Sequence, residues 1–169
     1  MAEFDEARDL LSKQMYKEAA EMLDRMTPTN KNKDEFWYLR GIVSLKLRNY
    51  DAAQEYFERA VLLDKKSKYY QIKGMAHFEV FEIEEAIDAF LKALALEPNN
   101  ATTHFFLSIC YLFLDDPRSD FYIRKARKID TKKTKQLLLN FYSLFLKNDP
   151  HMSTAQKAKI EEKIRKIKT

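Results

Sequence analysis

Glycine and proline are scarce in this sequence, with two and four residues among 169. Because β-sheet proteins need many tight turns, which these residues favour, the shortage argues against an all-β fold. Cysteine occurs once, as Cys110, which excludes an internal disulfide framework and a zinc site built from cysteines. The sequence also lacks an apolar run of the roughly 20 residues that a membrane-spanning helix needs, so we expect no membrane insertion.

Hydrophobic residues make up 46% of the chain and charged residues 33%, a balance typical of a packed, well-solvated helical protein. The first residues, MAEFDEARDLL, are acidic, whereas a secretory signal begins with a basic segment and continues with an apolar one. A chain with so few thiols also suits a reducing compartment. These features predict a cytoplasmic location.

The net charge of +4 conceals two parts of opposite sign. Residues 118–169 contain 15 Lys and Arg against 5 Asp and Glu, and residues 1–117 contain 15 basic and 21 acidic residues, so that +10 and −6 make up the total. Such a basic segment attracts nucleic acid or an acidic protein surface, or it keeps the outer faces of helices in water. Its candidate binding residues are Arg118, Arg124, Lys125, Arg127, Lys128, Lys132, Lys133 and Lys135.

The sequence repeats itself with a period of 33 or 34 residues, in copies at about 1–33, 34–66, 67–100 and 101–133. Apolar residues recur at three- and four-residue spacing in two blocks of each copy, which predicts two amphipathic helices per copy. A short polar turn separates the two helices, at Gln14–Lys17, Arg48–Asp51, Glu82–Glu84 and Asp115–Asp116. Small residues let the helices approach closely: Ala7, Gly41, Gly74 and Ser108 in the first helices, and Ala19, Ala53, Ala86 and Ser119 in the second. We expect Phe57 and Phe90 to fill the gaps between successive copies.

This pattern resembles the tetratricopeptide repeat, whose signature is W-x2-L-G-x2-Y, followed by A-x3-F and P. The second copy matches at Trp37, Gly41, Ala53 and Phe57, and the third at Tyr70, Gly74, Ala86, Phe90 and Pro98. Arg40 and Lys73 depart from the signature, because they stand where it has leucine. The resemblance covers about residues 2–130 and implies an all-α, right-handed α-solenoid, with residues 1–169 forming one domain.

Residues 134–169 are interpreted as a degenerate fifth unit. Thr134–Lys147 predicts a first helix, but Phe141 stands at the small-residue position, so a partner helix cannot pack as closely. Ser153 and Gln156 form a capping-box pattern for a helix over Thr154–Ile167. The narrow apolar side of this helix, under many lysines, is typical of a helix that caps a solenoid.

In the family that the sequence resembles, the first helices line a concave groove that binds extended peptides or a partner helix. Carried onto this sequence, the groove positions are apolar and aromatic for the most part: Tyr38, Ile42, Gln71, Met75, Phe78, Phe105, Ile109, Leu138 and Tyr142. We expect Met75, Phe105, Ile109 and Tyr142 to form one continuous strip. A ligand peptide, a second copy of the chain or the helix Thr154–Ile167 should cover it, because large apolar side chains gain free energy on burial.

Family members that bind the acidic tails of heat-shock chaperones use Lys, Asn and Arg to hold carboxylates. Here the matching positions carry Tyr38, Ile42, Ile72, Thr102 and Phe106, or, one copy earlier, Phe4, Arg8, Leu39, Lys68 and Ile72. The sequence therefore predicts no chaperone clamp. It also contains no phosphate-binding loop or catalytic motif, and we assign no catalytic residue, cofactor or metal. The three histidines (His77, His104 and His151) and Cys110 are interpreted as packed or surface residues.

Two functions remain open on the sequence. The first is a non-catalytic adaptor that binds an apolar peptide or an amphipathic helix in the groove, or associates with itself. The alternative is a nucleic-acid-binding or ribosome-associated protein that uses the basic C-terminal third. Against the alternative, Phe121 and Tyr122 are the only aromatic residues interleaved with the basic run, and we expect both in the core.

Overall fold

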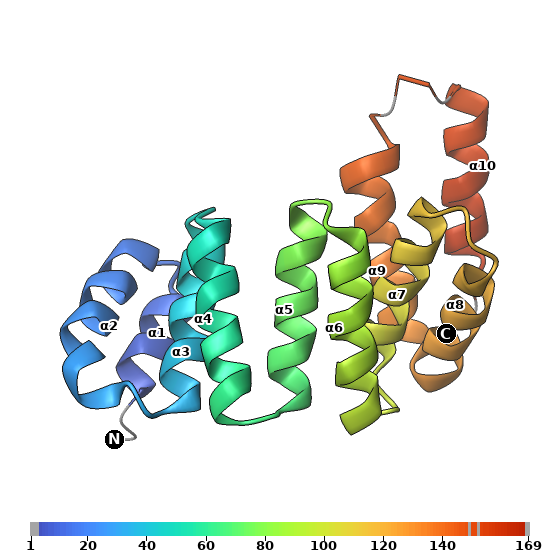
Figure 1. Cartoon of the computed structure of the whole chain (residues 1–169). Helices are drawn as coiled ribbons and strands as arrows, with labels where there is room; N and C mark the ends of the chain where they lie inside the picture. The colour runs from blue at the N-terminus through green and yellow to red at the C-terminus, as the bar shows by residue number, and fades with distance from the viewer. Residues whose placement is uncertain (1–3, 149, 152, 168–169) are drawn as a thin grey trace. The chain divides into compact units, whose positions relative to one another are not determined.

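The computed structural model describes residues 4–148, 150–151 and 153–167, without the side chains of residues 156, 159, 160 and 163. Every regular element in this part of the chain is helical, which confirms the predicted all-α repeat fold (Figure 1). The elements are α1 (Asp5–Ser12), α2 (Tyr16–Asn30), α3 (Asp34–Lys46), α4 (Tyr50–Leu63), α5 (Ser67–Glu79), α6 (Ile83–Leu96), α7 (Ala101–Phe113), α8 (Arg118–Ile129), α9 (Thr131–Phe141), the π-helix η1 (Tyr142–Leu146) and α10 (Thr154–Arg165). None of these helices is long and apolar enough to span a membrane.

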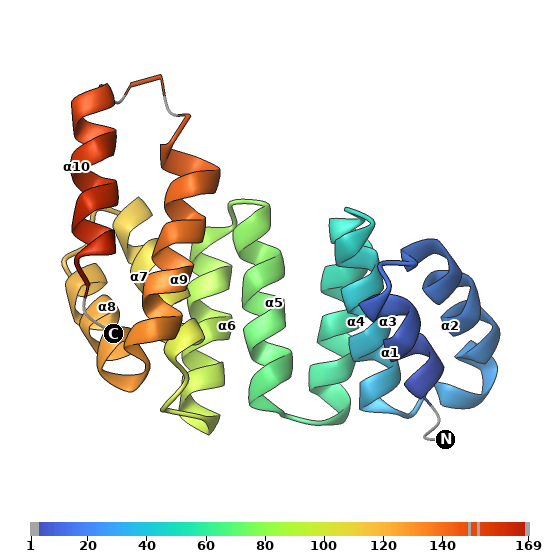
Figure 2. The same ribbon diagram turned by 180° about the vertical axis from the view of Figure 1, so that it is seen from behind.

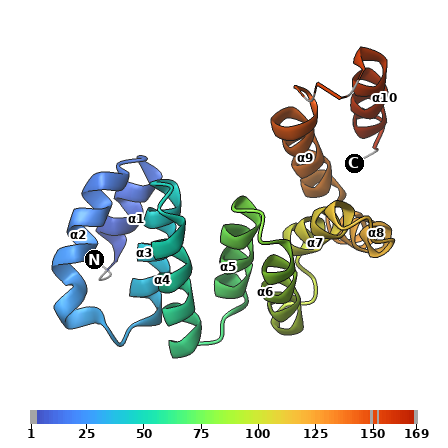
Figure 3. The same cartoon turned by 45° about the horizontal axis from the view of Figure 1, so that its top comes forward.

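The helices gather into two compact units, one that ends at Leu96 and one that begins at Glu97. In the first unit, helices α1 to α6 pack mainly against their neighbours in the chain, as both side views show (Figures 1 and 2). In the second unit, α7 packs against α8 and α9, and α10 lies beside α9 (Figure 3). The expectation that residues 1–169 form one domain stays a prediction.

A glycine and a phenylalanine hold the two helices of each central copy together. A Cβ atom on Gly41 would lie 2.3 Å from the Phe57 ring, and one on Gly74 would lie 2.7 Å from the Phe90 ring. Only a residue without a side chain allows this approach. Phe57 also packs in one buried cluster with Ala76 of the next copy, so it fills the gap between copies as predicted and fixes the helix pair within its own copy.

The turn between the two helices repeats in all four copies with one left-handed residue. The φ angle is 60° at Gln14 and Arg48, 61° at Phe81 and 52° at Asp115. In the second copy the amide of Arg48 donates to the Leu45 carbonyl at 3.0 Å, and the amide of Asn49 donates to the Ser44 carbonyl at 2.9 Å. Equivalent bonds recur in the other three copies. This is the Schellman arrangement, in which glycine is the usual left-handed residue.

The predicted turn of the third copy is displaced by one residue, because its left-handed position is Phe81 and not Glu82. Sequence patterns mark such positions by glycine or asparagine, and this chain has neither at any of the four. The Phe81 side chain is exposed.

The two departures from the family signature form ion pairs between successive copies. Arg40 on α3 pairs with Asp24 on α2, and Lys73 on α5 pairs with Glu58 on α4. Asp24 and Glu58 are 34 residues apart, so the two pairs are equivalent. The Arg40 guanidinium also lies 4.6 Å from the centre of the Tyr56 ring. At the position where the signature has leucine, Arg40 and Lys73 therefore form ion pairs with the preceding copy in place of apolar contacts. Arg40 adds a cation–π contact within its own copy.

The fifth unit begins earlier than predicted. Helix α9 starts at Thr131 and not at Thr134, because the Asp130 side chain accepts a hydrogen bond from the Lys133 amide at 2.8 Å and caps the helix. At its other end the helix widens into the π-helix η1, where the Phe141 ring contacts the rings of Phe113 and Phe145. This widening was not predicted, because no sequence pattern distinguishes a π turn from an α turn.

Helix α10 runs along α9 and contacts it over a small surface, as a bulky Phe141 predicts. The Tyr142 hydroxyl donates to the Lys157 carbonyl at 3.1 Å, and the Lys135 ammonium donates to the Ile167 carbonyl at 2.9 Å. The helix ends at Arg165, two residues before the predicted end. The predicted capping box involves the Gln156 side chain, which lies outside the described residues.

Candidate partner-binding groove

Four of the predicted groove residues lie on helices α3 and α5 of the first unit. Tyr38 and Ile42 are four residues apart on α3, and Gln71 and Met75 are four apart on α5, so each pair shares one helix face. All four side chains are half-buried. Phe78, one turn further along α5, is buried at 8% exposure. Each of the two helices therefore carries predicted groove residues that the chain covers only in part, and the groove itself stays a prediction.

Charged groups lie near Tyr38. The Lys68 ammonium lies 5.0 Å from the centre of the Tyr38 ring, which also contacts the Tyr69 ring at 4.9 Å. At the α1 side, Arg8 donates to Glu35 at 2.7 Å. Burial raises the pKa of the Tyr38 hydroxyl, and the negative charge of Glu35 raises it further, so this tyrosine stays neutral. The surroundings of Tyr38 therefore combine aromatic contacts with the Lys68 cation and, towards α1, the Arg8–Glu35 ion pair.

A buried tyrosine sets the position of α5 relative to α3. Tyr69 is fully buried, and its hydroxyl donates to the Asp34 carboxylate at 2.5 Å. The Lys66 ammonium reaches the same carboxylate at 2.5 Å. Although partial burial alone would raise the pKa of Asp34, these two hydrogen bonds hold it below its usual value. This network was not predicted from the sequence, because the repeat pattern aligns Tyr70, and not Tyr69, with the signature residue.

In the second unit the chain itself buries most of the predicted groove residues. Phe105 is 2% exposed, Ile109 is 4% exposed and Tyr142 is 5% exposed, whereas Leu138 is half-buried. Tyr142 is engaged with α10 through its hydroxyl. The predicted continuous strip joins Met75 of the first unit with these residues of the second, and it stays a prediction.

The predicted basic residues differ in their surroundings. Arg118 is bound locally, since it pairs with Asp116 at 2.6 Å and lies 4.2 Å from the centre of the Tyr111 ring. The remaining side chains are exposed on α8 and on the first turn of α9, and among the described residues they have no carboxylate partner. They are Arg124, Lys125, Arg127, Lys128, Lys132 and Lys133.

One expectation for this segment is wrong. Phe121 was placed in the core, but its side chain is 51% exposed, and the Lys125 ammonium lies 5.5 Å from its ring centre. Tyr122 is half-buried and stacks on Tyr111 at 5.3 Å. On a helix with few apolar residues, periodicity alone did not distinguish the inward from the outward aromatic residue.

The residues considered for chemistry are engaged within the protein. Cys110 is fully buried, and burial raises the pKa of its thiol to about 12, so it is not a reactive thiolate. Nε2 of His104 donates a hydrogen bond to the Pro98 carbonyl at 2.9 Å, and burial lowers the pKa of the imidazole. His77 contacts Gln54 and Glu82. No three His, Cys, Asp or Glu side chains within the described part of the chain are placed to hold a metal ion.

The tetratricopeptide-repeat family model matches residues 34–67 and 67–100. A TPR repeat-containing protein of Methanocaldococcus jannaschii is 27% identical over 93 residues, which is 55% of this chain but only 16% of that protein. This chain therefore spans about a sixth of the length of the curated relative that it matches.

Three solved structures share the fold. MamA residues 41-end from Desulfovibrio magneticus RS-1 give a TM-score of 0.73 at 20% identity over 96% of this chain and 91% of that one. Another crystal structure of MamA gives 0.72 at 20% identity, over 94% and 92%. YrrB, described as a TPR protein with an unusual peptide-binding site, gives 0.71 at 23% identity, over 82% and 71%. The chain therefore contains two tetratricopeptide repeats, at residues 34–67 and 67–100, and the solved structures share its helical-repeat fold.

Proposed function

We propose that this chain is a protein-interaction module that binds an apolar peptide or an amphipathic helix across α3 and α5. The observation that carries this proposal is the row of half-buried Tyr38, Ile42 and Met75 on adjacent first helices. Burying their remaining exposed surface under a ligand gains roughly 25 cal/mol per Å². The repeat family and the peptide-binding site named for YrrB support this assignment.

The groove chemistry favours an apolar ligand with acidic residues near one end. Lys68 is the cation that flanks the apolar centre, while Arg8 is already paired with Glu35. Tyr38 and Ile42 stand at positions where a chaperone-tail site needs carboxylate-binding side chains, so we do not propose a chaperone tail as the ligand. Such a module acts by holding a partner in place and needs no catalytic group of its own.

Ile42→Lys and Met75→Lys are expected to weaken ligand binding at least 100-fold, since each places a charge in the apolar centre. The ligand is a peptide selected from a displayed random library against the wild-type protein, and binding is measured by titration calorimetry. The control is Leu62→Lys on α4, because Leu62 is 75% exposed and lies outside the groove. Unchanged affinity in both groove variants, or unfolding of both by circular dichroism, contradicts the assigned site.

A second candidate function is binding of single-stranded nucleic acid by α8. It is favoured by the exposed Phe121 beside Lys125, together with Arg124, Arg127 and Lys128, which have no carboxylate partner among the described residues. An exposed aromatic ring can stack on a base while neighbouring cations contact phosphates. We propose this role as separate from the groove.

For this candidate, the Arg124→Glu, Arg127→Glu and Lys128→Glu triple variant should lose at least 10-fold in affinity for a labelled 15-nucleotide oligo-dT, measured by fluorescence anisotropy. Wild-type binding should also weaken steeply with salt, as phosphate contacts require. A charge-matched reversal in the first unit at Lys17, Arg25 and Lys65, which are all exposed, serves as control. Equal affinity in the basic-patch variant and the control would exclude the role.

A further inference from the structure

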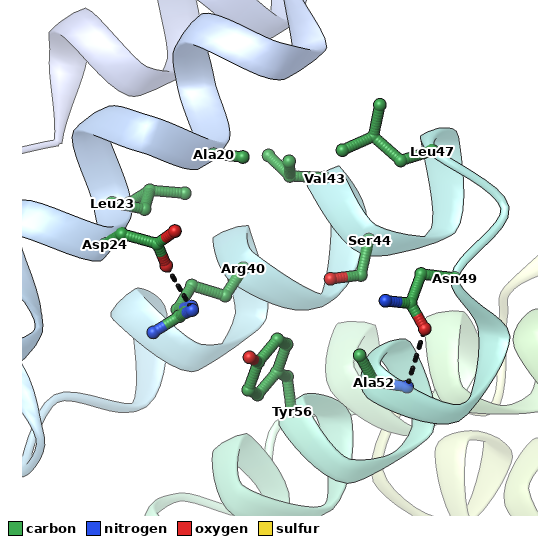
Figure 4. Close-up of a pocket in the computed structure, with 10 residues that line it drawn as sticks. All are labelled: Ala20, Leu23, Asp24, Arg40, Val43, Ser44, Leu47, Asn49, Ala52 and Tyr56. Atoms are coloured by element: carbon green, nitrogen blue, oxygen red, sulfur yellow. Dashed lines mark hydrogen bonds and ion pairs between the residues drawn. The ribbon is translucent and has the colours of Figure 1, made fainter.

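The first unit contains a cavity on the side of α3 that faces away from the groove. It has a volume of about 370 Å³ and is enclosed by α2, α3 and α4 (Figure 4). Arg40 and Ser44 line it, and each follows a groove residue, Tyr38 or Ile42, by two positions. Two positions along an α-helix turn the side chain by about 200°. The cavity and the groove therefore lie on opposite sides of one helix.

The equivalent cleft of the next repeat is occupied by the protein's own side chains. Gln54 and His77 stand where the cavity has Ala20 and Ser44, 34 and 33 residues earlier. The Gln54 amide lies 3.1 Å from Nδ1 of His77 and donates to Glu82 at 2.6 Å, and the same imidazole nitrogen lies 2.6 Å from Glu82. A planar ring and an amide thus meet in the second cleft, whereas small side chains leave the first cleft empty.

The cavity wall is apolar on one side and carries free hydroxyl groups on the other. Leu47, which is 41% exposed, and the half-buried Ala20 and Ala52 form the apolar side. Among the described residues, the hydroxyls of Ser44 and Tyr56 have no hydrogen-bond partner, and both residues line the cavity. The Arg40 guanidinium is already engaged by Asp24 and by Thr27, to which it donates at 2.8 Å. Asp24 and Asn49 also line the cavity, so its polar side combines neutral groups with the Asp24 carboxylate that Arg40 pairs with.

We propose that this cavity is a second binding site, which takes an aromatic ring with a hydrogen-bonding edge, a tyrosine or histidine side chain, from a partner polypeptide. The ring packs on Ala20 and Leu47, and its polar edge bonds to the hydroxyls of Ser44 and Tyr56. The volume falls within the range of small-ligand sites and exceeds what one such side chain needs. The side chain of the partner would thus occupy the place that His77 and Gln54 fill in the next repeat.

The test is a methyl NMR titration of the full chain with N-acetyl-tyrosinamide and N-acetyl-histidinamide as probes. We expect saturable shifts of the Ala20, Val43 and Leu47 methyl signals with at least one of these two probes. N-acetyl-leucinamide and N-acetyl-lysinamide should bind at least 10-fold more weakly, because neither combines a ring with a polar edge. Equal binding of the leucine probe, or no saturable shift with either ring probe, overturns the proposal.

Two reciprocal variants sharpen the test. The double variant Ala20→Gln and Ser44→His copies the second cleft into the first and should reduce ring-probe affinity at least 10-fold. The double variant Gln54→Ala and His77→Ser opens the second cleft and should add a new shift at the Ala76 methyl. If the filled variant binds as wild type and the opened variant gains no site, the proposal is wrong. The groove variant Ile42→Lys should bind the ring probes normally. A failure of the cavity proposal can therefore be distinguished from a failure of the proposed groove function.

Discussion

Gly41→Leu is expected to lower the free energy of unfolding by about 3 kcal/mol or more, near the upper end of the cost of overpacking a core. The physical reason is the Phe57 ring, which would lie 2.3 Å from the first atom of the new side chain. For a unit of this size, the melting temperature should fall by more than about 10 °C. Thermal unfolding followed by circular dichroism measures the effect, and Lys46→Leu, an exposed position on the same helix, is the control.

A double-mutant cycle distinguishes this steric conflict from a general loss of helix stability. Phe57→Ala alone should cost about 3–5 kcal/mol, because it leaves a cavity in a fully buried position. Combined with Gly41→Leu, the loss should be smaller than the sum by about 2 kcal/mol, since the leucine fills part of that cavity. Strictly additive losses would mean that the two side chains do not compete for the same space.

Glycine at all four left-handed turn positions is expected to raise the free energy of unfolding by about 2–4 kcal/mol in total. A residue with a Cβ atom pays roughly 1–2 kcal/mol in this conformation, and the greater freedom of glycine in the unfolded chain offsets part of the gain. The four substitutions are Gln14→Gly, Arg48→Gly, Phe81→Gly and Asp115→Gly. Urea denaturation should show higher midpoints with unchanged slopes.

The neighbouring position gives a matched control. Leu47 has a φ angle of −83°, so Leu47→Gly should lower stability by about 0.5–1 kcal/mol although it is next to Arg48. Opposite signs for Leu47→Gly and Arg48→Gly are the expected result. A loss of stability in both variants would show that the Arg48 side chain contributes more than its backbone strain costs.

The repeat architecture could be predicted because it depends on steric contacts that recur with a fixed period. A glycine at position 41 or 74 and a phenylalanine 16 residues later leave one way for two helices to pack. Each copy repeats the same constraint, so a comparison of the copies with one another shows which positions are constrained by packing. The helix pairs and their approximate boundaries followed from this period alone.

The features that were not predicted depend on local charge or on contacts that do not recur from one copy to the next. The network of Asp34, Lys66 and Tyr69 joins residues that have no counterpart in the signature. The exposure of Phe121 depends on how α8 turns its few apolar residues, which composition does not determine. Of the candidate site, the sequence indicated which residues share a helix face and gave the chain's own helix Thr154–Ile167 as one of three covers, but it did not decide that the chain buries Phe105 and Tyr142.

The ion pairs between copies have a consequence for how such an array changes length. The copy at 34–66 carries a base on its first helix, Arg40, and an acid on its second, Glu58. In a tandem duplicate of this copy, the acid of one would meet the base of the other, in the same way that Glu58 meets Lys73. Insertion of one unit therefore preserves this acid–base pair at the new junction. The gene segment for this copy can be duplicated in frame without the need for a compensating mutation in these pairs.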